Sequence, residues 1–202
     1  VLTILAISGR SARRQMASQG FLLRRQSSRT GFDSFGVALS LYNRYQVVGL
    51  LPPDTYEVEV VGEGGRSLAK PEDNLLIRSF RATLAKFDIP PVGLKLKSYN
   101  AIPLSRGLGS SASAIVGGVM LANAVGMLSL QREKLLSLMV ELEGHPDNVV
   151  PCCIGGFVIS AWDGKEVKYV KLPAFEEKIK VVVAVPDVTV DTKMAREVLP
   201  KS

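Results

Sequence analysis

The sequence predicts an α+β fold, in which strands and helices mix without regular βαβ alternation. Three observations support this class. Residues 56–61 and 92–99 alternate apolar and polar side chains, as half-buried strands do. Residues 74–87 repeat apolar side chains at three- and four-residue spacing, which is typical of an amphipathic helix. Residues 112–130 carry no charge, which suits a buried helix.

The remaining segments follow in chain order. Residues 32–48 form an apolar, aromatic stretch that ends at the turn-forming pair Pro52-Pro53. Pro90 and Pro91 end the helix at 74–87, and a glycine- and serine-rich loop joins the strand at 92–99 to the uncharged helix. Beyond these segments the pattern predicts a helix at 131–142, strands at 155–162, 167–172 and 180–185, and a helix at 191–199.

Composition places the chain among ordinary globular proteins. With 47% hydrophobic and 22% charged residues, it is not collagen-like, disordered or a coiled coil. The net charge of +6 comes from residues 1–30, which hold six arginines and no acid, whereas the rest carries 19 basic and 19 acidic groups. Residues 1–30 therefore form a separate Arg/Ser-rich segment that resembles an organellar presequence. The neutral body argues against nucleic acid as a partner.

The cysteines and the uncharged helix bear on location. Cys152 and Cys153 are adjacent, so they cannot form the disulfide framework of a secreted domain, and we expect a reducing compartment, the cytoplasm. Residues 112–130 approach the length of a membrane span. They contain several glycines and serines, including Gly117 and Gly118, which favours a packed helix in a protein without a membrane partner.

The loop before the uncharged helix is the strongest chemical signal. Backbone N–H groups at such a helix start can point at an anion, and the helix dipole adds positive potential. Phosphate is the expected ligand, and serine hydroxyls there can reach phosphate oxygens or Mg²⁺. The alternative is a glycine-rich helix start with a serine cap; a Walker A loop is excluded because no Gly-Lys-Ser/Thr follows. The predicted loop residues are Pro103, Leu104, Ser105, Arg106, Gly107, Leu108, Gly109, Ser110, Ser111, Ala112 and Ser113.

Two further clusters carry polar groups. Glu143, His145, Asp147 and Asn148 gather at the predicted end of a helix, a set that suits a polar substrate and a metal. The alternative is that the histidine is a structural turn residue beside Pro146. The second cluster is the run from Thr192 to Pro200, where lysine and arginine on a short helix usually form a solvated face.

These segments resemble one enzyme family. The loop at 103–113 matches the ATP-binding signature of the GHMP kinases essentially position by position. The runs Glu-Gly-His-Pro-Asp-Asn-Val-x-Pro at 143–151 and Thr-Lys-x-Ala-Arg at 192–196 resemble the homoserine kinase branch. The resemblance implies a GHMP kinase N-terminal domain of the ribosomal protein S5 domain 2-like type at residues 31–173. It also implies the beginning of a ferredoxin-like C-terminal domain at 174–202.

The resemblance also implies the chemistry. ATP would bind the loop, and Mg²⁺ would bind Ser111 and Glu143. The acceptor would be the hydroxyl of L-homoserine and the product O-phospho-L-homoserine, on the route to threonine, with a homodimer as the possible assembly. Asp147 would hold the substrate ammonium, and it is also the best carboxylate candidate for a base. The other implied substrate or catalytic residues are Asp33, His145, Asn148 and Arg196.

The chain departs from this family just before Gly31-Phe32-Asp33, where the family normally carries an asparagine that contacts the acceptor. Codons for Arg25-Gln26-Ser27 can read Ala-Asn-Leu after a one-base shift, so a frame-shifted start is an alternative to a presequence. Two alternative functions also stay open. One is another GHMP kinase, such as a mevalonate kinase. The other is a non-catalytic module that binds anions or nucleic acid through a basic arm at residues 10–29.

Overall fold

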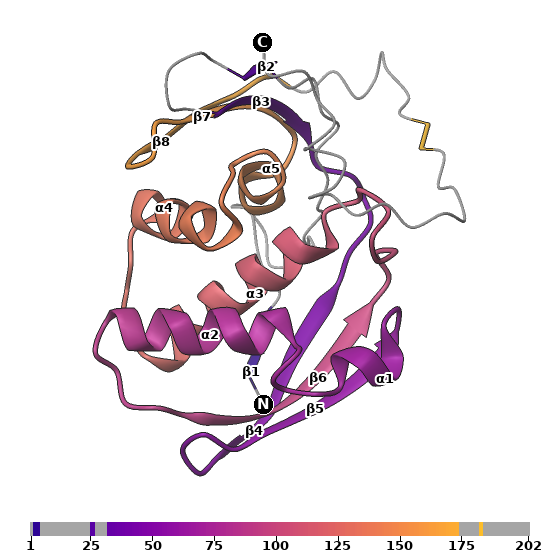
Figure 1. Cartoon of the computed structure of the whole chain (residues 1–202), viewed down its shortest axis with the longest axis vertical. Coiled ribbons are helices and arrows are strands. Elements are labelled where there is room, and N and C mark those ends of the chain that lie inside the picture. Colours follow the sequence, from indigo (N-terminus) through magenta and orange to yellow (C-terminus); the bar gives the residue numbers. More distant parts are fainter. Residues whose placement is uncertain (1, 5–24, 27–31, 174–181, 184–202) are drawn as a thin grey trace.

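Two β-sheets enclose a layer of helices in the computed structural model (Figure 1). The structure describes residues 2–4, 25–26, 32–173 and 182–183, and its elements confirm the α+β class. In the described residues, one sheet has the order β1-β4-β6-β5 and the other the order β2-β3-β7-β8. The strands are β1 (Leu2–Ile4), β2 (Arg25–Gln26), β3 (Phe32–Val37), β4 (Arg44–Leu51), β5 (Tyr56–Gly62), β6 (Gly93–Asn100), β7 (Phe157–Trp162) and β8 (Val167–Lys171).

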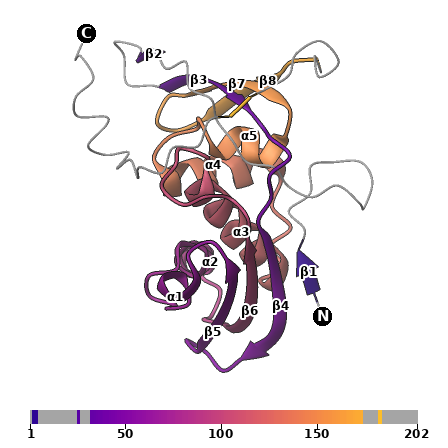
Figure 2. The same ribbon diagram turned by 90° about the vertical axis from the view of Figure 1, so that its right-hand side faces the viewer.

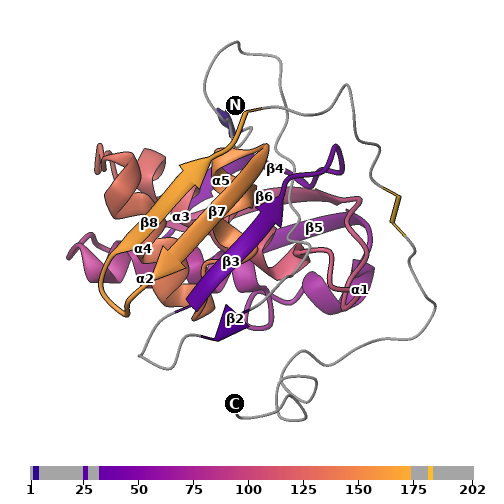
Figure 3. The same cartoon turned by 90° about the horizontal axis from the view of Figure 1, so that it is seen from above.

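The helices lie between these sheets, and Figure 3 shows β3, β7 and β8 stretched across them. They are α1 (Gly65–Leu68), α2 (Leu75–Lys86), α3 (Ser110–Val125), α4 (Arg132–Glu143) and α5 (Val149–Ile154). Figure 2 shows the same layers from the side, with α3 in the middle. Buried side chains of α3 belong to both hydrophobic clusters: Val116 is in the cluster that includes residues of α4, α5 and β7, and Leu121 is in the cluster that includes residues of α2, β4 and β6. The helix that follows the predicted loop is therefore the centre of the core.

The apolar stretch at 32–48 divides between the two sheets. β3 pairs antiparallel with β7, whereas β4 pairs antiparallel with β6 in the other sheet. β5 lies parallel to β6 on its other side. The segment between β3 and β4 thus crosses from one sheet to the other and brings Asn43 to the point where the chain enters β4.

Most predicted helices and strands are present, with shifted ends. α2 begins at Leu75, one residue after the predicted start, and Asn74 caps it: its Oδ1 accepts hydrogen bonds from Leu76 N at 3.0 Å and Ile77 N at 3.3 Å. The uncharged helix begins earlier than expected, at Ser110, and ends at Val125 instead of residue 130. Positive φ angles at Met127 (49°) and Ser129 (52°) are incompatible with a continued helix.

Some expectations concern residues outside the described part. These are the strand at 180–185 apart from residues 182–183, the helix at 191–199, the ferredoxin-like segment at 174–202, and Arg196. Within residues 1–30, the structure has two short strands, with β1 paired to β4 and β2 paired to β3. No helix among the described residues is both long and apolar enough to cross a membrane.

We expect the protein to lose stability at alkaline pH because of the two buried cysteines in α5. Both are free thiols; burial raises the pKa of Cys153 from 9.0 to about 11 and also raises the pKa of Cys152. Above about pH 9 the unfolded chain releases these protons before the folded chain does. The free energy of unfolding should therefore fall by up to about 1.4 kcal/mol per pH unit for each thiol between about pH 9 and 11.

Urea unfolding at several pH values checks this expectation. The control is the variant Cys152→Ala/Cys153→Ala, which should show a shallower slope over the same range whatever its stability at neutral pH. An equal slope in both proteins would contradict the assignment to the thiols.

Candidate active site

The loop between β6 and α3 has a positive φ angle at every second residue from 105 to 109. Ser105, Gly107 and Gly109 have φ angles of +55°, +72° and +73°. Gly109 is the N-cap of α3, and no side chain caps the helix at this position. The first hydrogen bond within the helix runs from Ser113 N to Gly109 O at 3.0 Å. The amides just before Ser113 therefore have no partner within the helix. Successive N–H groups in such a conformation form a concave site for an anion.

Arg106 provides a cation in this loop. Its Nη1 atom is buried and has no hydrogen-bond partner among the described residues. A buried guanidinium nitrogen without an acceptor is costly, and an anion bound in the loop would satisfy it. Leu104 anchors the preceding part of the loop, because a Cβ placed on Gly64 would lie 2.8 Å from Leu104 Cδ1. The loop thus combines free amides with one cation, as phosphate binding requires.

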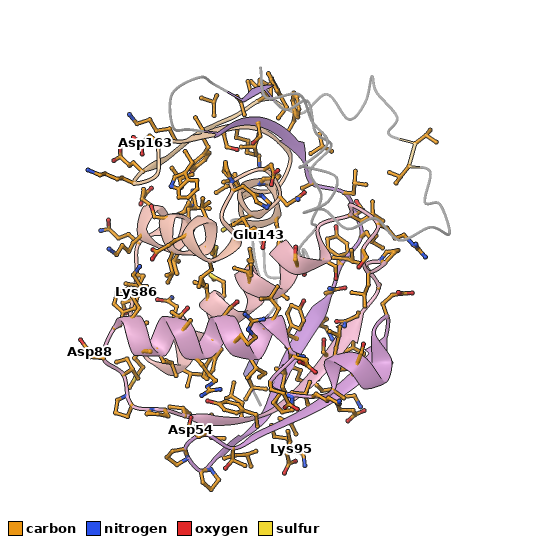
Figure 4. All side chains as sticks on the ribbon, viewed as in Figure 1. Asp54, Lys86, Asp88, Lys95, Glu143 and Asp163 are labelled. Carbon is orange, nitrogen blue, oxygen red and sulfur yellow. The ribbon has the colours of Figure 1, made fainter. Side chains whose placement is uncertain are left out.

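Ser111 and Glu143 face each other across the start of α3 and the end of α4. Ser111 Oγ donates a hydrogen bond to Glu143 Oε1 at 2.9 Å. Figure 4 shows Glu143 in the middle of the molecule, well away from Asp54, Asp88 and Lys95. The hydroxyl and carboxylate are hard oxygen donors, the type that Mg²⁺ prefers, and they lie next to the loop amides. The residues present therefore fit a magnesium ion shared with a bound phosphate.

A buried histidine, His145, lies next to Glu143, and a buried aspartate, Asp147, is hydrogen-bonded to the histidine. Glu143 Oε1 lies 3.9 Å from His145 Nε2, and His145 Nδ1 hydrogen-bonds to Asp147 Oδ1. Asp147 Oδ1 also accepts from the backbone N–H of Asn148 at 2.9 Å. Asp147 is 3% exposed and His145 is 7% exposed, so the carboxylate is held in a defined position.

Asn148 brings the predicted loop at 103–113 into contact with the polar cluster at 143–148. A Cβ on Gly109 would lie 3.6 Å from Asn148 Oδ1 and 3.7 Å from its Cβ and Cγ, so the asparagine packs over the N-cap of α3. The structure therefore brings the loop together with Glu143, His145, Asp147 and Asn148. Asp33 lies in β3, paired with Ala161 of β7. Arg196 lies outside the described residues.

The sequence analysis did not identify two residues of this region, Asn43 and Tyr45. Asn43 Oδ1 accepts hydrogen bonds from the backbone of Ala101 and Ile102, and Tyr45 Oη lies 3.2 Å from Ser113 Oγ. An asparagine just before an alternating strand is a weak sequence signal, because it equally suits a turn.

The loop and its flanking elements match a known family. A family model described as the N-terminal domain of GHMP kinases matches residues 74–156. A homoserine kinase of Carboxydothermus hydrogenoformans is 45% identical over 171 residues, which cover 84% of this chain and 55% of that protein. Residues 74–156 belong to the GHMP kinase N-terminal domain family. The chain spans little more than half the length of that curated relative.

Solved structures share the GHMP kinase fold. A homoserine kinase from Cytophaga hutchinsonii is 25% identical with a TM-score of 0.59, over 97% of this chain and 63% of that chain. The mevalonate kinase of Methanococcus jannaschii has a TM-score of 0.54 at 18% identity, over 70% of this chain and 49% of that chain. At that identity the likeness shows the fold alone.

Proposed function

We propose that the protein is a homoserine kinase, which transfers the γ-phosphoryl group of ATP to the side-chain hydroxyl of L-homoserine. The bond between the γ-phosphorus and the β,γ-bridging oxygen breaks, a bond to the homoserine oxygen forms, and the hydroxyl proton leaves. The observation that carries this proposal is the Ser111–Glu143 pair at the amide-lined loop. The choice of homoserine rests on the relatives, which are named homoserine kinases at 41–45% identity.

The loop supports ATP as the phosphoryl donor. Its first-turn amides and Arg106 suit the negative charge of the phosphates, and catalysis of phosphoryl transfer depends mainly on positioning and charge stabilisation. Ser111 and Glu143 would hold Mg²⁺, and Mg²⁺, when bound, neutralises charge on the phosphates. No group of three or more histidine, cysteine or carboxylate side chains forms a metal site in the described part of the chain.

The buried cluster supports the amino-acid end of the substrate. Asp147 would bind the substrate ammonium, helped by His145, Asn148 and Asp33, and Arg196 would bind the carboxylate. Asp147 is held by His145 and by the amide of Asn148, so its carboxyl group is in position before substrate binds. A homodimeric state, which rests on the family resemblance, and a cytoplasmic location, which rests on the two adjacent cysteines, complete the proposal.

ADP release from Mg·ATP by the purified chain tests the function, with L-homoserine and mevalonate measured in parallel. We expect turnover with homoserine and none with mevalonate. Turnover with mevalonate alone would replace the proposal by another GHMP kinase activity. If neither is turned over, thermal stabilisation by Mg·ATP would retain nucleotide binding and refute homoserine phosphorylation by this chain. A chain that Mg·ATP does not stabilise would contradict both parts.

A further inference from the structure

The side chain of Asn43, which lies outside the loop, hydrogen-bonds to the backbone just before the loop begins. Asn43 Oδ1 accepts hydrogen bonds from the backbone N–H groups of Ala101 and Ile102, each at 3.0 Å. These two residues follow the end of β6 and directly precede the loop residues 103–109. The same oxygen therefore satisfies two consecutive amides at the point where the sheet no longer provides partners for them.

The same asparagine is linked to the other end of the loop. Asn43 Nδ2 donates to Tyr45 Oη at 3.3 Å, and Tyr45 Oη hydrogen-bonds to Ser113 Oγ at 3.2 Å. Ser113 lies in the first turn of α3, and both Tyr45 and Ser113 are 6% exposed. The Tyr45 ring also packs on the next turn, where a Cβ on Gly117 would lie 2.7 Å from two of its ring carbons. Burial raises the pKa of Tyr45 to about 12, so its hydroxyl keeps its proton at neutral pH.

We propose that Asn43 and Tyr45 are positioning residues that fix the two ends of the phosphate loop and thereby set the affinity for nucleotide. This inference rests on the proposed function, because it concerns the same loop. The loop needs such support, since Ser105 holds a left-handed conformation that a residue with a Cβ rarely adopts. A loop held in its binding conformation loses less conformational freedom when the phosphates bind.

Nucleotide affinity of three variants tests the role. Asn43→Ala removes both loop contacts, Tyr45→Phe removes the hydroxyl and keeps the ring, and the double variant removes both. We expect the dissociation constant of Mg·ATP to rise about 10-fold for Asn43→Ala and about 3-fold for Tyr45→Phe, as loss of one or two hydrogen bonds implies. The double variant should lose less than the product of these factors, because the two side chains act through one network.

Asn123 provides a matched control on the same helix. Its Oδ1 accepts a hydrogen bond from Leu130 N at 2.9 Å, near the opposite end of α3. Asn123→Ala therefore loses an asparagine and a backbone contact of the same kind without touching the loop. We expect a similar fall in melting temperature to that of Asn43→Ala, with Mg·ATP affinity within about 2-fold of the parent protein.

Amide hydrogen exchange without nucleotide separates this inference from the proposed function. Residues 101–111 should exchange faster in Asn43→Ala than in Asn123→Ala. If the parent chain binds no Mg·ATP, the proposed function fails, and faster exchange at 101–111 alone still supports the positioning role. The role is overturned if exchange at 101–111 is equal in the two variants. It is also overturned if exchange rises in Asn43→Ala while measurable Mg·ATP affinity stays at the control value.

Discussion

Replacing Glu143 by glutamine should lower kcat/KM for Mg·ATP by about 10³-fold while the protein stays folded. The carboxylate lies 2.9 Å from Ser111 Oγ, beside the loop amides, and we propose that this pair holds Mg²⁺. Glutamine keeps the shape of the side chain and an oxygen that accepts from Ser111, but it removes the negative charge. Loss of one group that stabilises transition-state charge typically costs about 10²–10³-fold, and a metal ligand belongs at the upper end of that range.

Glu141 is the matched control for this substitution. It lies two residues earlier on α4 and forms an exposed ion pair with Lys86 on the helix surface. Such surface pairs contribute at most about 1 kcal/mol to stability, so Glu141→Gln should change kcat/KM less than about 2-fold. A second measurement does not depend on turnover: the Mg²⁺ dependence of ATP binding should largely disappear in Glu143→Gln and persist in Glu141→Gln. Equal behaviour of the two variants would contradict the role of Glu143.

The sequence predicted those elements well whose own residues show a clear helix or strand pattern. α2 has helical spacing of apolar residues, so its start was predicted within one residue. α5 was missed because it has six residues and contains Pro151, and a helix this short is unstable unless tertiary packing supports it. Val149, Val150, Pro151 and Cys152 are all buried there, so packing against α3, α4 and the strands determines this helix.

The candidate site likewise contains parts that the sequence predicted and contacts that only the fold shows. The loop at 103–113 and the run at 143–148 are each contiguous, and their residue types indicate phosphate and polar-substrate chemistry without knowledge of the fold. That Ser111 meets Glu143 follows only once α3 and α4 are packed together. Asn43 could not be assigned, because its contacts at Ala101 and Ile102 are 58 and 59 residues away along the chain. Sequence patterns detect local chemistry, whereas supporting contacts between distant segments need the fold.

The uncharged sequence of α3 has a structural reason that a single substitution can test. The helix packs on both sides, and at Gly118 it lies against the backbone of α2. A Cβ at Gly118 would lie 2.4 Å from Leu76 O, 2.8 Å from Ser79 Cβ and 2.9 Å from Phe80 N. Two of these atoms belong to the backbone of α2, so they cannot turn away. Gly118→Ala should therefore lower the free energy of unfolding by about 3 kcal/mol, measured by urea denaturation.

The sign of this effect is the diagnostic result. In an ordinary helix position glycine is less stable than alanine by about 0.5–1 kcal/mol, so Gly→Ala normally stabilises. Gly65→Ala provides that reference, because Gly65 begins α1 and a Cβ there meets no atom within 4 Å. We expect Gly65→Ala to be neutral or slightly stabilising and Gly118→Ala to be strongly destabilising. If both substitutions stabilised the protein, the backbone of α2 could not lie this close to α3 at Gly118, and the helix that follows the loop at 103–109 would sit differently in the core.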